Sequence, residues 1–272
     1  MGVLNCTPDS FSDGGNFIDS ASASNTDLSA GCMHVDRAVQ HGLSMWKQGA
    51  SIIDVGGEST RPGAAPVTLQ AELDRVIPVI RALSTQGCTV SVDSMKAEVM
   101  RQAIDAGATI INDVSALTFD PDSLSVVAES GVDLCLMHMQ GTPDTMQINP
   151  EYNNVVEAVT TFLAQRIEAC LQAGVKEASI ILDPGIGFGK RLDDNITLIR
   201  AIDDFKRAFD LPVLLGLSRK SFLGQLTGAG VEDRELETAV AGAVGIANGV
   251  DILRVHDIPM QRRAIRLASA LT

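Results

Sequence analysis

The sequence predicts one (β/α)8 barrel, the α/β fold in which eight parallel strands alternate with helices around a closed ring. The chain has 272 residues, close to the length of about 250 that is typical of this fold. Eight short apolar runs are separated by amphipathic helical stretches, as in a series of βα units. Apolar residues make up 45% of the chain and aromatic residues only 4%, so we expect a core of branched aliphatic side chains.

Each predicted strand is a short apolar run that ends in polar residues or glycine. In chain order these runs lie at 3–4, 52–55, 90–92, 110–111, 134–137, 180–182, 213–215 and 252–253. The carboxyl ends of parallel barrel strands share one face, and in this fold that face carries the active site. The polar residues that follow the eight runs are therefore expected to converge.

The predicted helices occupy the stretches between these runs. They lie at 31–49, 69–86, 95–106, 122–130, 153–173, 193–209, 233–248 and 258–271, and Lys220-Ser221 begins a further helix. Gly107, Gly131, Gly174 and Gly249 follow predicted helix ends, where a left-handed C-cap needs no Cβ. Asp93-Ser94 is expected to cap the third helix.

The regular alternation, with no linker, predicts one domain over residues 1–272. The first strand starts almost at residue 1, so we expect no segment ahead of it at the bottom of the barrel. Residues 16–30 are rich in Ser, Ala, Asp and Asn and are interpreted as a long insertion before the first helix. Such a loop on the catalytic face is either a lid or an inert insertion, and the sequence does not choose.

Composition and charge argue against several classes of protein. A net charge of −13 is unfavourable for binding nucleic acid or an anionic membrane. No apolar run approaches the roughly 18 residues of a membrane span, and no secretory signal opens the chain. The cysteines are scattered and lack C-x-x-C spacing, which predicts reduced thiols in the cytoplasm and no zinc site. They are Cys6, Cys32, Cys88, Cys135 and Cys170.

An acid and amide group is expected among the strand ends. Asp93, Asn112 and Asp183 each follow an apolar run. Any one of them alone is also explained as a helix cap. Together, carboxylate acceptors and an amide suit a planar heterocycle that presents N–H donors, such as the guanidine-like edge of a pyrimidine.

Basic residues form a second group on the same face. Arg61, Lys220, Arg254 and His256 come from three different strand ends and suggest an anionic ligand such as phosphate. Arg254 and His256 are two positions apart, so in a strand their side chains point the same way. A structural histidine is the alternative for His256, and it is the preferred interpretation of His138.

Glycines near these clusters let backbone approach a ligand. The spacing of Gly185, Gly187 and Gly189 is nevertheless wrong for a dinucleotide-binding fingerprint, and the sequence contains no Walker A motif.

Four segments together resemble the dihydropteroate synthases. They are GVLNCTPDSFSDGG (2–15), DVGGESTRPG (54–63), DPGIGFGK (183–190) and SRKS (218–221), with 93–94, 111–113, 136–141 and 254–257 in the family's order. The resemblance covers essentially the whole chain. It implies a TIM barrel that joins 4-aminobenzoate to 6-hydroxymethyl-7,8-dihydropterin diphosphate, releasing diphosphate and forming 7,8-dihydropteroate for folate biosynthesis. It also implies a cytoplasmic homodimer that sulfonamides inhibit.

The resemblance assigns roles to individual residues. The pterin would be bound by Asp93, Asn112, Asp183 and Lys220, with Met137 and Gly216 lining its slot. The diphosphate would be held by Asn5, Arg254 and His256, and Asn5 would also reach Mg²⁺. The 4-aminobenzoate side would comprise Asp9, Phe11, Thr60, Arg61, Pro62, Phe188, Lys220 and Ser221. The catalytic residues would be Asp9, Lys220, Arg254 and His256, and residues 7–15 and 57–63 would be mobile loops.

This chemistry is consistent with the residue types. Departing diphosphate needs its growing charge neutralised, which Mg²⁺, Arg254 and His256 would supply. Carboxylates around the cationic pterin methylene would favour attack by the arylamine, with no covalent enzyme intermediate. Lys220 as a Schiff-base lysine is a poorer interpretation, because neighbouring acids would favour its charged form.

Three alternatives stay open. A pterin-binding methyltransferase barrel with a corrinoid partner should lack the segments 7–11 and 218–221 that this chain contains. A catalytically silent paralogue would bind pterin without turnover, although the residues assigned to chemistry are intact. A sulfonamide-insensitive variant would perform the same reaction with an altered loop, and the insertion at 16–30 leaves this open.

Overall fold

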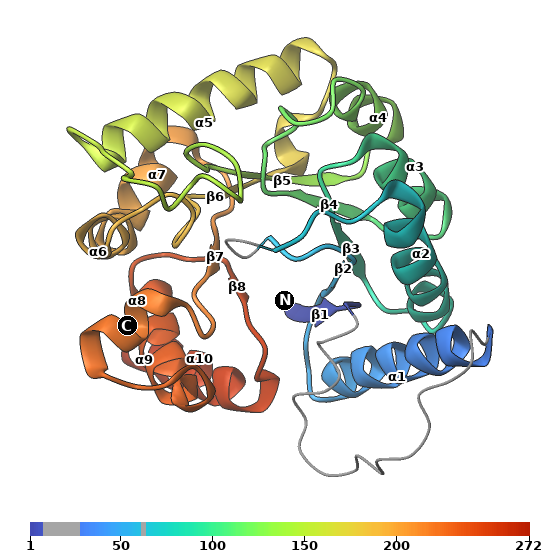
Figure 1. Ribbon diagram of the computed structural model, residues 1–272. Helices are drawn as coiled ribbons and strands as arrows, with labels where there is room; N and C mark the ends of the chain where they lie inside the picture. The colour runs from blue at the N-terminus through green and yellow to red at the C-terminus, as the bar shows by residue number, and fades with distance from the viewer. Residues whose placement is uncertain (8–27, 61–63) are drawn as a thin grey trace.

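The computed structural model describes residues 1–7, 28–60 and 64–272, with residues 28–33 described by their backbone alone (Figure 1). Its eight strands each lie within one or two residues of a predicted run. They are β1 Gly2–Asn5, β2 Ile53–Gly56, β3 Val90–Asp93, β4 Ile110–Asp113, β5 Asp133–Met137, β6 Ile180–Asp183, β7 Leu214–Gly216 and β8 Ile252–Arg254.

The strands form a closed parallel ring. Strands β1 to β6 pair in chain order, and β7 pairs with β8. Single parallel bridges complete the circle: Leu182 with Val213 between β6 and β7, and Gly2 with Val255 between β8 and β1. The predicted (β/α)8 barrel is therefore confirmed, with two narrow seams on either side of the β7–β8 pair.

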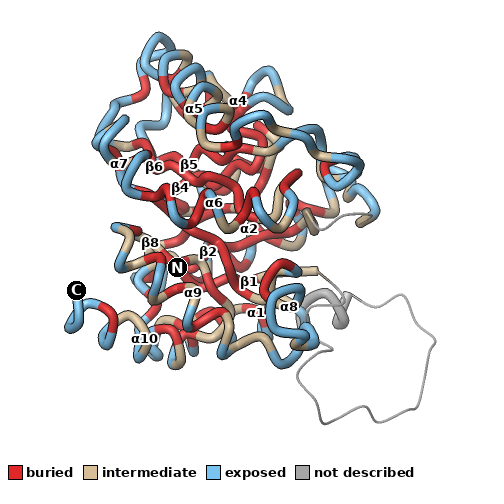
Figure 2. Tube along the Cα trace, turned by 90° about the vertical axis from the view of Figure 1, so that its left-hand side faces the viewer, coloured by how far each residue is buried: buried red, intermediate tan, exposed pale blue. Residues whose placement is uncertain are grey.

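Helices surround this ring, and the strands form its buried centre (Figures 1 and 2). The helices are α1 Leu28–Lys47, α2 Leu69–Thr85, α3 Ala97–Asp105, α4 Ser123–Ser130, α5 Val155–Gln172, α6 Leu192–Arg200, α7 Ile202–Phe209, α8 Ser221–Thr227, α9 Glu235–Ala247 and α10 Ile258–Leu271, with 3-10 turns at Glu177–Ser179 and Val231–Asp233. The four glycines predicted to follow helix ends all have positive φ, as expected: Gly107, Gly131, Gly174 and Gly249. In the described part of the chain, none of the helices has both the length and the apolar character needed to cross a membrane.

The helix predicted at 193–209 is in fact two helices, α6 and α7, broken at Ala201. No glycine or proline marks this break. Ala201 ends α6 by donating its N–H to Thr197 O and Leu198 O, and its own carbonyl accepts from Asp204. The bend lets both helices bury apolar side chains against the barrel, because Leu198 in α6 and Phe205 in α7 are almost fully buried.

The cap predicted for the third helix is also wrong. Helix α3 begins at Ala97, and its N–H donates to Asp120 Oδ2 at 2.9 Å, so the cap comes from a different loop. Ser94 Oγ accepts from the N–H of Lys96, the residue just before the helix, at 3.2 Å and donates to Glu72 Oε1 at 2.6 Å. Asp93 is engaged by an arginine across the barrel.

A small apolar cluster fills the lower part of the barrel interior and is separate from the larger core between strands and helices. Its members are Met1, Ile52, Cys135, Ile181, Leu214 and Ile252. Strand side chains alternate with a period of two, so residues two positions further along point to the same side. Above Ile52, Ile181 and Ile252 the interior therefore receives Asp54, Asp183 and Arg254.

Candidate active site

A polar layer lies directly above the apolar cluster, at the carboxyl ends of the strands. Its members come from five strands and are Asp54, Asp93, Asn112, Asp183 and Arg254. Four of these were predicted site residues, and Asp54 was not. Asp54, Asn112 and Asp183 are buried, so each of them needs a partner for its polar atoms.

Arg254 is the centre of this layer. Its Nε donates to Asp54 Oδ2 at 2.6 Å and its Nη2 donates to Asp93 Oδ2 at 2.7 Å. Asn112 Nδ2 donates to the same Asp54 oxygen at 3.1 Å. Burial alone lowers the pKa of Arg254, but Asp54 and Asp93 raise it by more, so the guanidinium stays charged.

Asp93 is the most perturbed acid in the layer. Burial raises its pKa to about 7, and Arg254 opposes this while Asp54 and Asp113 add to it. Three carboxyl groups near one arginine repel one another, so the ion pair with Arg254 does not fully offset desolvation. The net result is a pKa for Asp93 above the usual range of an aspartate, so burial favours its neutral form.

Asp183 and Lys220 lie close enough across the β6–β7 seam to shift each other's pKa. Asp183 Oδ1 accepts from the Gly185 N–H at 2.7 Å. Lys220 Nζ donates to Ile186 O and lies 4.7 Å from the centroid of the Phe188 ring. Burial lowers the pKa of Lys220 to about 8 although Asp183 raises it. The expected influence of the acid is present, but desolvation outweighs it.

Gly216 and Met137 border this pair. A Cβ on Gly216 would lie 3.6 Å from Lys220 Nζ and 4.0 Å from Arg254 Cβ, so the glycine leaves space between the two cations. Met137 is buried at the end of β5, in register with Asp183 on β6. Both therefore lie at the strand ends beside Asp183 and Lys220.

Asn5 ends β1 and lies near Asp93 across β2. Asn5 is in register with Gly56, and Gly56 with Asp93. A Cβ on Gly56 would lie 3.7 Å from Asn5 Oδ1 and 3.5 Å from Asp93 Cβ. A glycine in the middle strand thus lets the two flanking side chains share the space above it.

His256 lies beyond the last residue of β8, so the alternation argument that aligned it with Arg254 does not extend to it. Its Nδ1 lies 2.8 Å from Ser218 Oγ, and its backbone N–H donates to the same oxygen. Ser218 follows β7, so this contact ties the ends of β7 and β8 together. Arg254 contacts the opposite side of the barrel.

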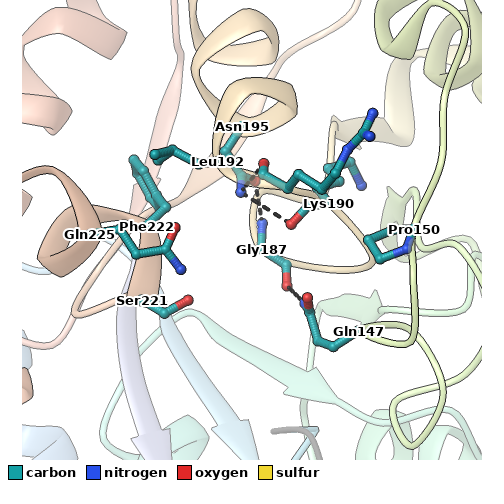
Figure 3. A pocket seen from close by; sticks show the side chains of 10 residues that line it. Gln147, Pro150, Gly187, Lys190, Leu192, Asn195, Ser221, Phe222 and Gln225 are labelled. Atoms are coloured by element: carbon teal, nitrogen blue, oxygen red, sulfur yellow. Dashed lines mark hydrogen bonds between the residues drawn. The ribbon is translucent and has the colours of Figure 1, made fainter.

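A cavity of about 310 Å³ adjoins this face between α6 and α8 (Figure 3). Ser221 and Gln225 of α8 face Gly187 across it. The backbone of Gly187 is held at both ends, because its N–H donates to Asn195 Oδ1 at 2.7 Å and its carbonyl accepts from Gln147 Nε2 at 2.7 Å. The cavity, at about 310 Å³, is at the lower end of the volumes of small-molecule sites, which begin at roughly 300 Å³.

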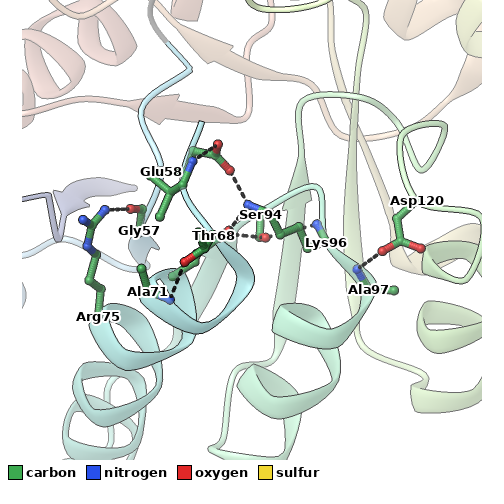
Figure 4. Close-up of polar contacts among 11 residues, drawn as sticks. Gly57, Glu58, Thr68, Ala71, Arg75, Ser94, Lys96, Ala97 and Asp120 are labelled. Atoms are coloured by element: carbon green, nitrogen blue, oxygen red, sulfur yellow. Dashed lines mark hydrogen bonds and ion pairs between the residues drawn. The ribbon is translucent and has the colours of Figure 1, made fainter. Parts of the chain in front are cut away.

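A cluster of charged residues anchors the segment after β2 (Figure 4). Lys96 Nζ contacts Glu58 Oε2 at 2.5 Å and also Glu72, which is fully buried in α2. Glu58 Oε1 accepts from the Val67 N–H at 2.9 Å, and Arg75 donates to Gly57 O at 2.9 Å. Glu58 and Val67 thus join the two ends of the segment that follows β2. Arg75 attaches this segment to α2, and Lys96 attaches it to the start of α3.

Some predicted residues lie outside the described part of the chain. These are Asp9, Phe11, Arg61 and Pro62, with most of the 7–15 loop and the 16–30 stretch; the side chain of Cys32 is likewise not described. Thr60 is the last described residue before this gap and is partly buried.

The structure supports two interpretations of the sequence: His138 as a structural histidine, and the cysteines as free thiols. His138 is buried, and its ring packs edge-on against Phe162 at 5.0 Å between centroids, as in a structural histidine. Burial raises the pKa of Cys6 to about 12, so this thiol stays protonated and fills space beside Asn5. Cys6, Cys88, Cys135 and Cys170 are all free and buried.

Asp54 was missed as a site residue, although a signal was present. It is an acid inside the apolar run Ile52-Ile53-Asp54-Val55. A carboxylate within a strand that is otherwise buried is costly unless a cation pairs with it. An acid at this position therefore indicated a cationic partner inside the barrel.

A closed (β/α)8 barrel that brings acid and amide groups together with the partly buried cations Arg254 and Lys220 at its strand ends defines an enzyme with a site for a small polar ligand. The model of the family described as pterin binding enzyme matches residues 1–256. The chain therefore belongs to the pterin binding enzymes, and to the dihydropteroate synthases within that family.

The relatives support this assignment over the full length. The dihydropteroate synthase of Escherichia coli strain K12 is 43% identical, covering 99% of this chain and 90% of its own. The dihydropteroate synthase of Synechocystis sp. is 41% identical, and the match covers 100% of this chain and 89% of that enzyme.

Solved structures agree with the sequence relatives. The Yersinia pestis dihydropteroate synthase with a sulfonamide drug complex has a TM-score of 0.88 at 40% identity, covering 99% of this chain and 92% of its own. The Xanthomonas albilineans enzyme with 4-aminobenzoic acid has a TM-score of 0.87 at 42% identity, covering 99% and 91%.

Proposed function

We propose that the chain transfers the pterinylmethyl group of 6-hydroxymethyl-7,8-dihydropterin diphosphate to 4-aminobenzoate at this strand-end face, releasing diphosphate and forming 7,8-dihydropteroate. This is the dihydropteroate synthase reaction. The observation that carries it is Arg254 held between two acids and next to Asp183 and Lys220, in a chain that matches those synthases from end to end.

The pterin binds in the slot between Asp93 and Asp183. Carboxylate oxygens accept from the donor edge of the ring, and Asn112 offers both an acceptor and donors. Lys220 borders the ring over the space left by Gly216. Because Asn112 and Asp183 are buried, a ligand that leaves them unpaired is rejected.

The diphosphate binds on the side of Arg254, His256 and Asn5. Two carboxylates keep the guanidinium charged and in place, so its positive charge is preorganised for the leaving group. The carbon–oxygen bond between pterin methylene and diphosphate breaks, its electrons go to the diphosphate, and the arylamine nitrogen forms the new bond. The amine then loses its proton.

Mg²⁺ fits this side of the site. Asn5 Oδ1 is a hard oxygen donor close to Asp93, and magnesium is commonly held by one or two protein oxygens together with substrate phosphates. No cluster of three or more His, Cys, Asp or Glu side chains that could hold a metal by itself occurs among the described residues. When bound, the ion would supply positive charge to the diphosphate oxygens.

The arylamine enters from the side of Phe188, Ser221 and Thr60, next to the cavity of Figure 3. The family resemblance assigns Asp9, Phe11, Arg61 and Pro62 to the same substrate, and these four lie outside the described residues. Sulfonamides, which resemble 4-aminobenzoate, compete there. A sulfonamide-insensitive variant would have the same reaction and a different inhibition constant.

Self-association is part of the proposal. An apolar groove crosses α6, α8 and α9, and it is lined by Ile196, Leu226, Leu236, Val240 and Val244 among others. Leu236 and Val240 are 67% and 57% exposed, unusually high for apolar side chains that lie together. A second copy of the chain covers this groove in the homodimer that the family resemblance implies. The buried free cysteines are consistent with a cytoplasmic location.

A turnover assay tests the reaction. Purified protein with Mg²⁺, pterin diphosphate and 4-aminobenzoate should release diphosphate and form 7,8-dihydropteroate, and a sulfonamide should compete with 4-aminobenzoate. Absence of product above a no-enzyme control would refute the proposal and favour a silent paralogue. Competition measured in the same assay decides sulfonamide sensitivity.

The pterin slot has its own test. Replacing Asp183 by Ala should remove detectable pterin binding by calorimetry, because the ring donors lose their buried acceptor. Asp210→Ala, a change at an exposed acid outside the site, should leave pterin affinity unchanged. Equal affinities in the two variants would exclude Asp183 from the slot.

A further inference from the structure

We propose that Asp54 is a positioning residue that holds Arg254 and Asn112 at once, so that a single carboxylate links the diphosphate side of the site to the pterin side. The inference rests on the function proposed above. It gives a role of its own to a residue that the sequence prediction had not used, beyond its ion pair with Arg254.

The geometry concentrates both contacts on one oxygen. Asp54 is fully buried in β2. Its Oδ2 accepts from Arg254 Nε of β8 at 2.6 Å and from Asn112 Nδ2 of β4 at 3.1 Å. Among the described residues its Oδ1 has no hydrogen-bond partner. Three strands are thus connected through a single atom.

Arg254 has two acid partners, and we expect only one of them to keep its contact with Arg254 when pterin binds. Asp93 is the acid that the incoming pterin also uses, so its bond to Arg254 competes with the ring donors. Asp54 is fully buried and in register with Ser91, two residues before Asp93, so it lies deeper in the barrel and keeps its contact with Nε when Asp93 is engaged by pterin. Only two of the five guanidinium N–H groups are used in these two bonds, which leaves donors for phosphate oxygens.

The same argument applies to Asn112. Its amide nitrogen is fixed by Asp54, so the side-chain oxygen is directed away from that bond and is available to a ring donor. Without Asp54, an amide rotates readily and its oxygen and nitrogen exchange roles. Asp54 therefore orients the pterin-binding amide as well as the arginine.

If Asp54 had a purely structural role, its removal would have a different effect on ligand binding. A buried carboxylate that only stabilises the barrel would, when removed, lower stability and reduce affinity for every ligand alike. Asp113 provides the matched control, because it is equally buried at the end of β4 and accepts from Ser115 and Leu117 instead of site residues.

The experiment is calorimetry with two separate probes, inorganic diphosphate with Mg²⁺ and free 6-hydroxymethyl-7,8-dihydropterin. Asp54→Asn should weaken diphosphate binding about tenfold or more, the loss expected for a charge-assisted hydrogen bond, and weaken pterin binding less. Asp113→Asn should lower the unfolding temperature and change the ratio of the two affinities much less than Asp54→Asn does, because Asp113 bonds to no site residue. A folded Asp54→Asn protein with the wild-type ratio would overturn the proposal.

A double-variant comparison covers the case in which Asp54→Asn does not fold. Arg254→Met and Asp54→Asn/Arg254→Met should bind diphosphate with the same residual affinity, because Asp54 acts on diphosphate through Arg254. A further loss in the double variant would overturn the proposal. If wild-type protein neither binds diphosphate nor forms product, the proposed function fails instead, whatever the variants do.

Discussion

At the scale of single residues, burial sets the charge state of the groups near the site. Lys190 is buried, and its Nζ contacts His138 Nδ1 at 3.0 Å and the carbonyls of His138 and Phe188. Burial lowers its pKa to about 7, and burial together with Lys190 lowers the pKa of His138 to about 3. His138 is thus a neutral acceptor, and Lys190 connects the loop after β5 to the loop after β6.

This lysine predicts a pH dependence of stability. Its pKa in the folded protein is below the unfolded value of 10.5, so between about pH 7 and about pH 10 the unfolded chain binds more protons than the native chain. Its contribution to the free energy of unfolding therefore rises with pH across this window. Lys190→Met should flatten the rise by an amount on the order of a few kcal/mol, measured by urea unfolding at several pH values.

The matched control for this prediction is Lys176→Met, at a lysine whose side chain is exposed. It should retain the wild-type pH profile. The same steep rise in the Lys190→Met protein would show that other groups cause it.

At the scale of elements, the contacts between the segment after β2 and helices α2 and α3 connect one substrate loop to the barrel. Glu58 joins the two ends of this segment through Lys96 and the Val67 N–H. Glu72 also contacts Lys96 Nζ, and Ser94 Oγ donates to Glu72. The segment 57–63 belongs to the arylamine side of the proposed site, so its anchoring should affect that substrate more than the pterin.

Glu58→Gln removes the charge that pairs with Lys96 and keeps the shape of the side chain. We expect the KM for 4-aminobenzoate to rise about fivefold, the effect of roughly 1 kcal/mol, with a smaller change in the KM for pterin diphosphate. Steady-state kinetics with each substrate varied in turn checks this. Glu98→Gln, at an exposed ion pair with Arg101, is the control and should change neither constant. Equal changes in both KM values after Glu58→Gln would contradict a loop-specific role.

At the scale of the whole molecule, the apolar groove over α6, α8 and α9 predicts association. Val240→Asp places a charge in this groove at a 57% exposed position. It should convert a dimer to a monomer in analytical ultracentrifugation, because an interface core tolerates an unpaired charge poorly. Leu267→Asp, at a 63% exposed leucine of α10 outside the groove, should leave the mass unchanged. A monomeric wild-type protein would contradict the homodimer.

Much of this architecture could be predicted because its signals are local. Strand and helix periodicities, and the glycines after helix ends, depend on neighbouring residues, and they located all eight strands. The break at Ala201 and the cap from Asp120 could not be predicted, because neither has a nearby sequence signal. Both follow from how the helices pack on the barrel.

By itself, the sequence determined the barrel, the polar strand ends and the family, since Asp93, Asn112, Asp183 and Arg254 each come directly after an apolar run. Only the tertiary structure decided which of these groups pair. Arg254 bonds to Asp54 and Asp93, which are 200 and 161 residues away in the chain. Pairing over such separations depends on the closure of the ring through the two seams that flank β7 and β8. Closure is a property of eight strands together, and no local pattern of residues encodes it.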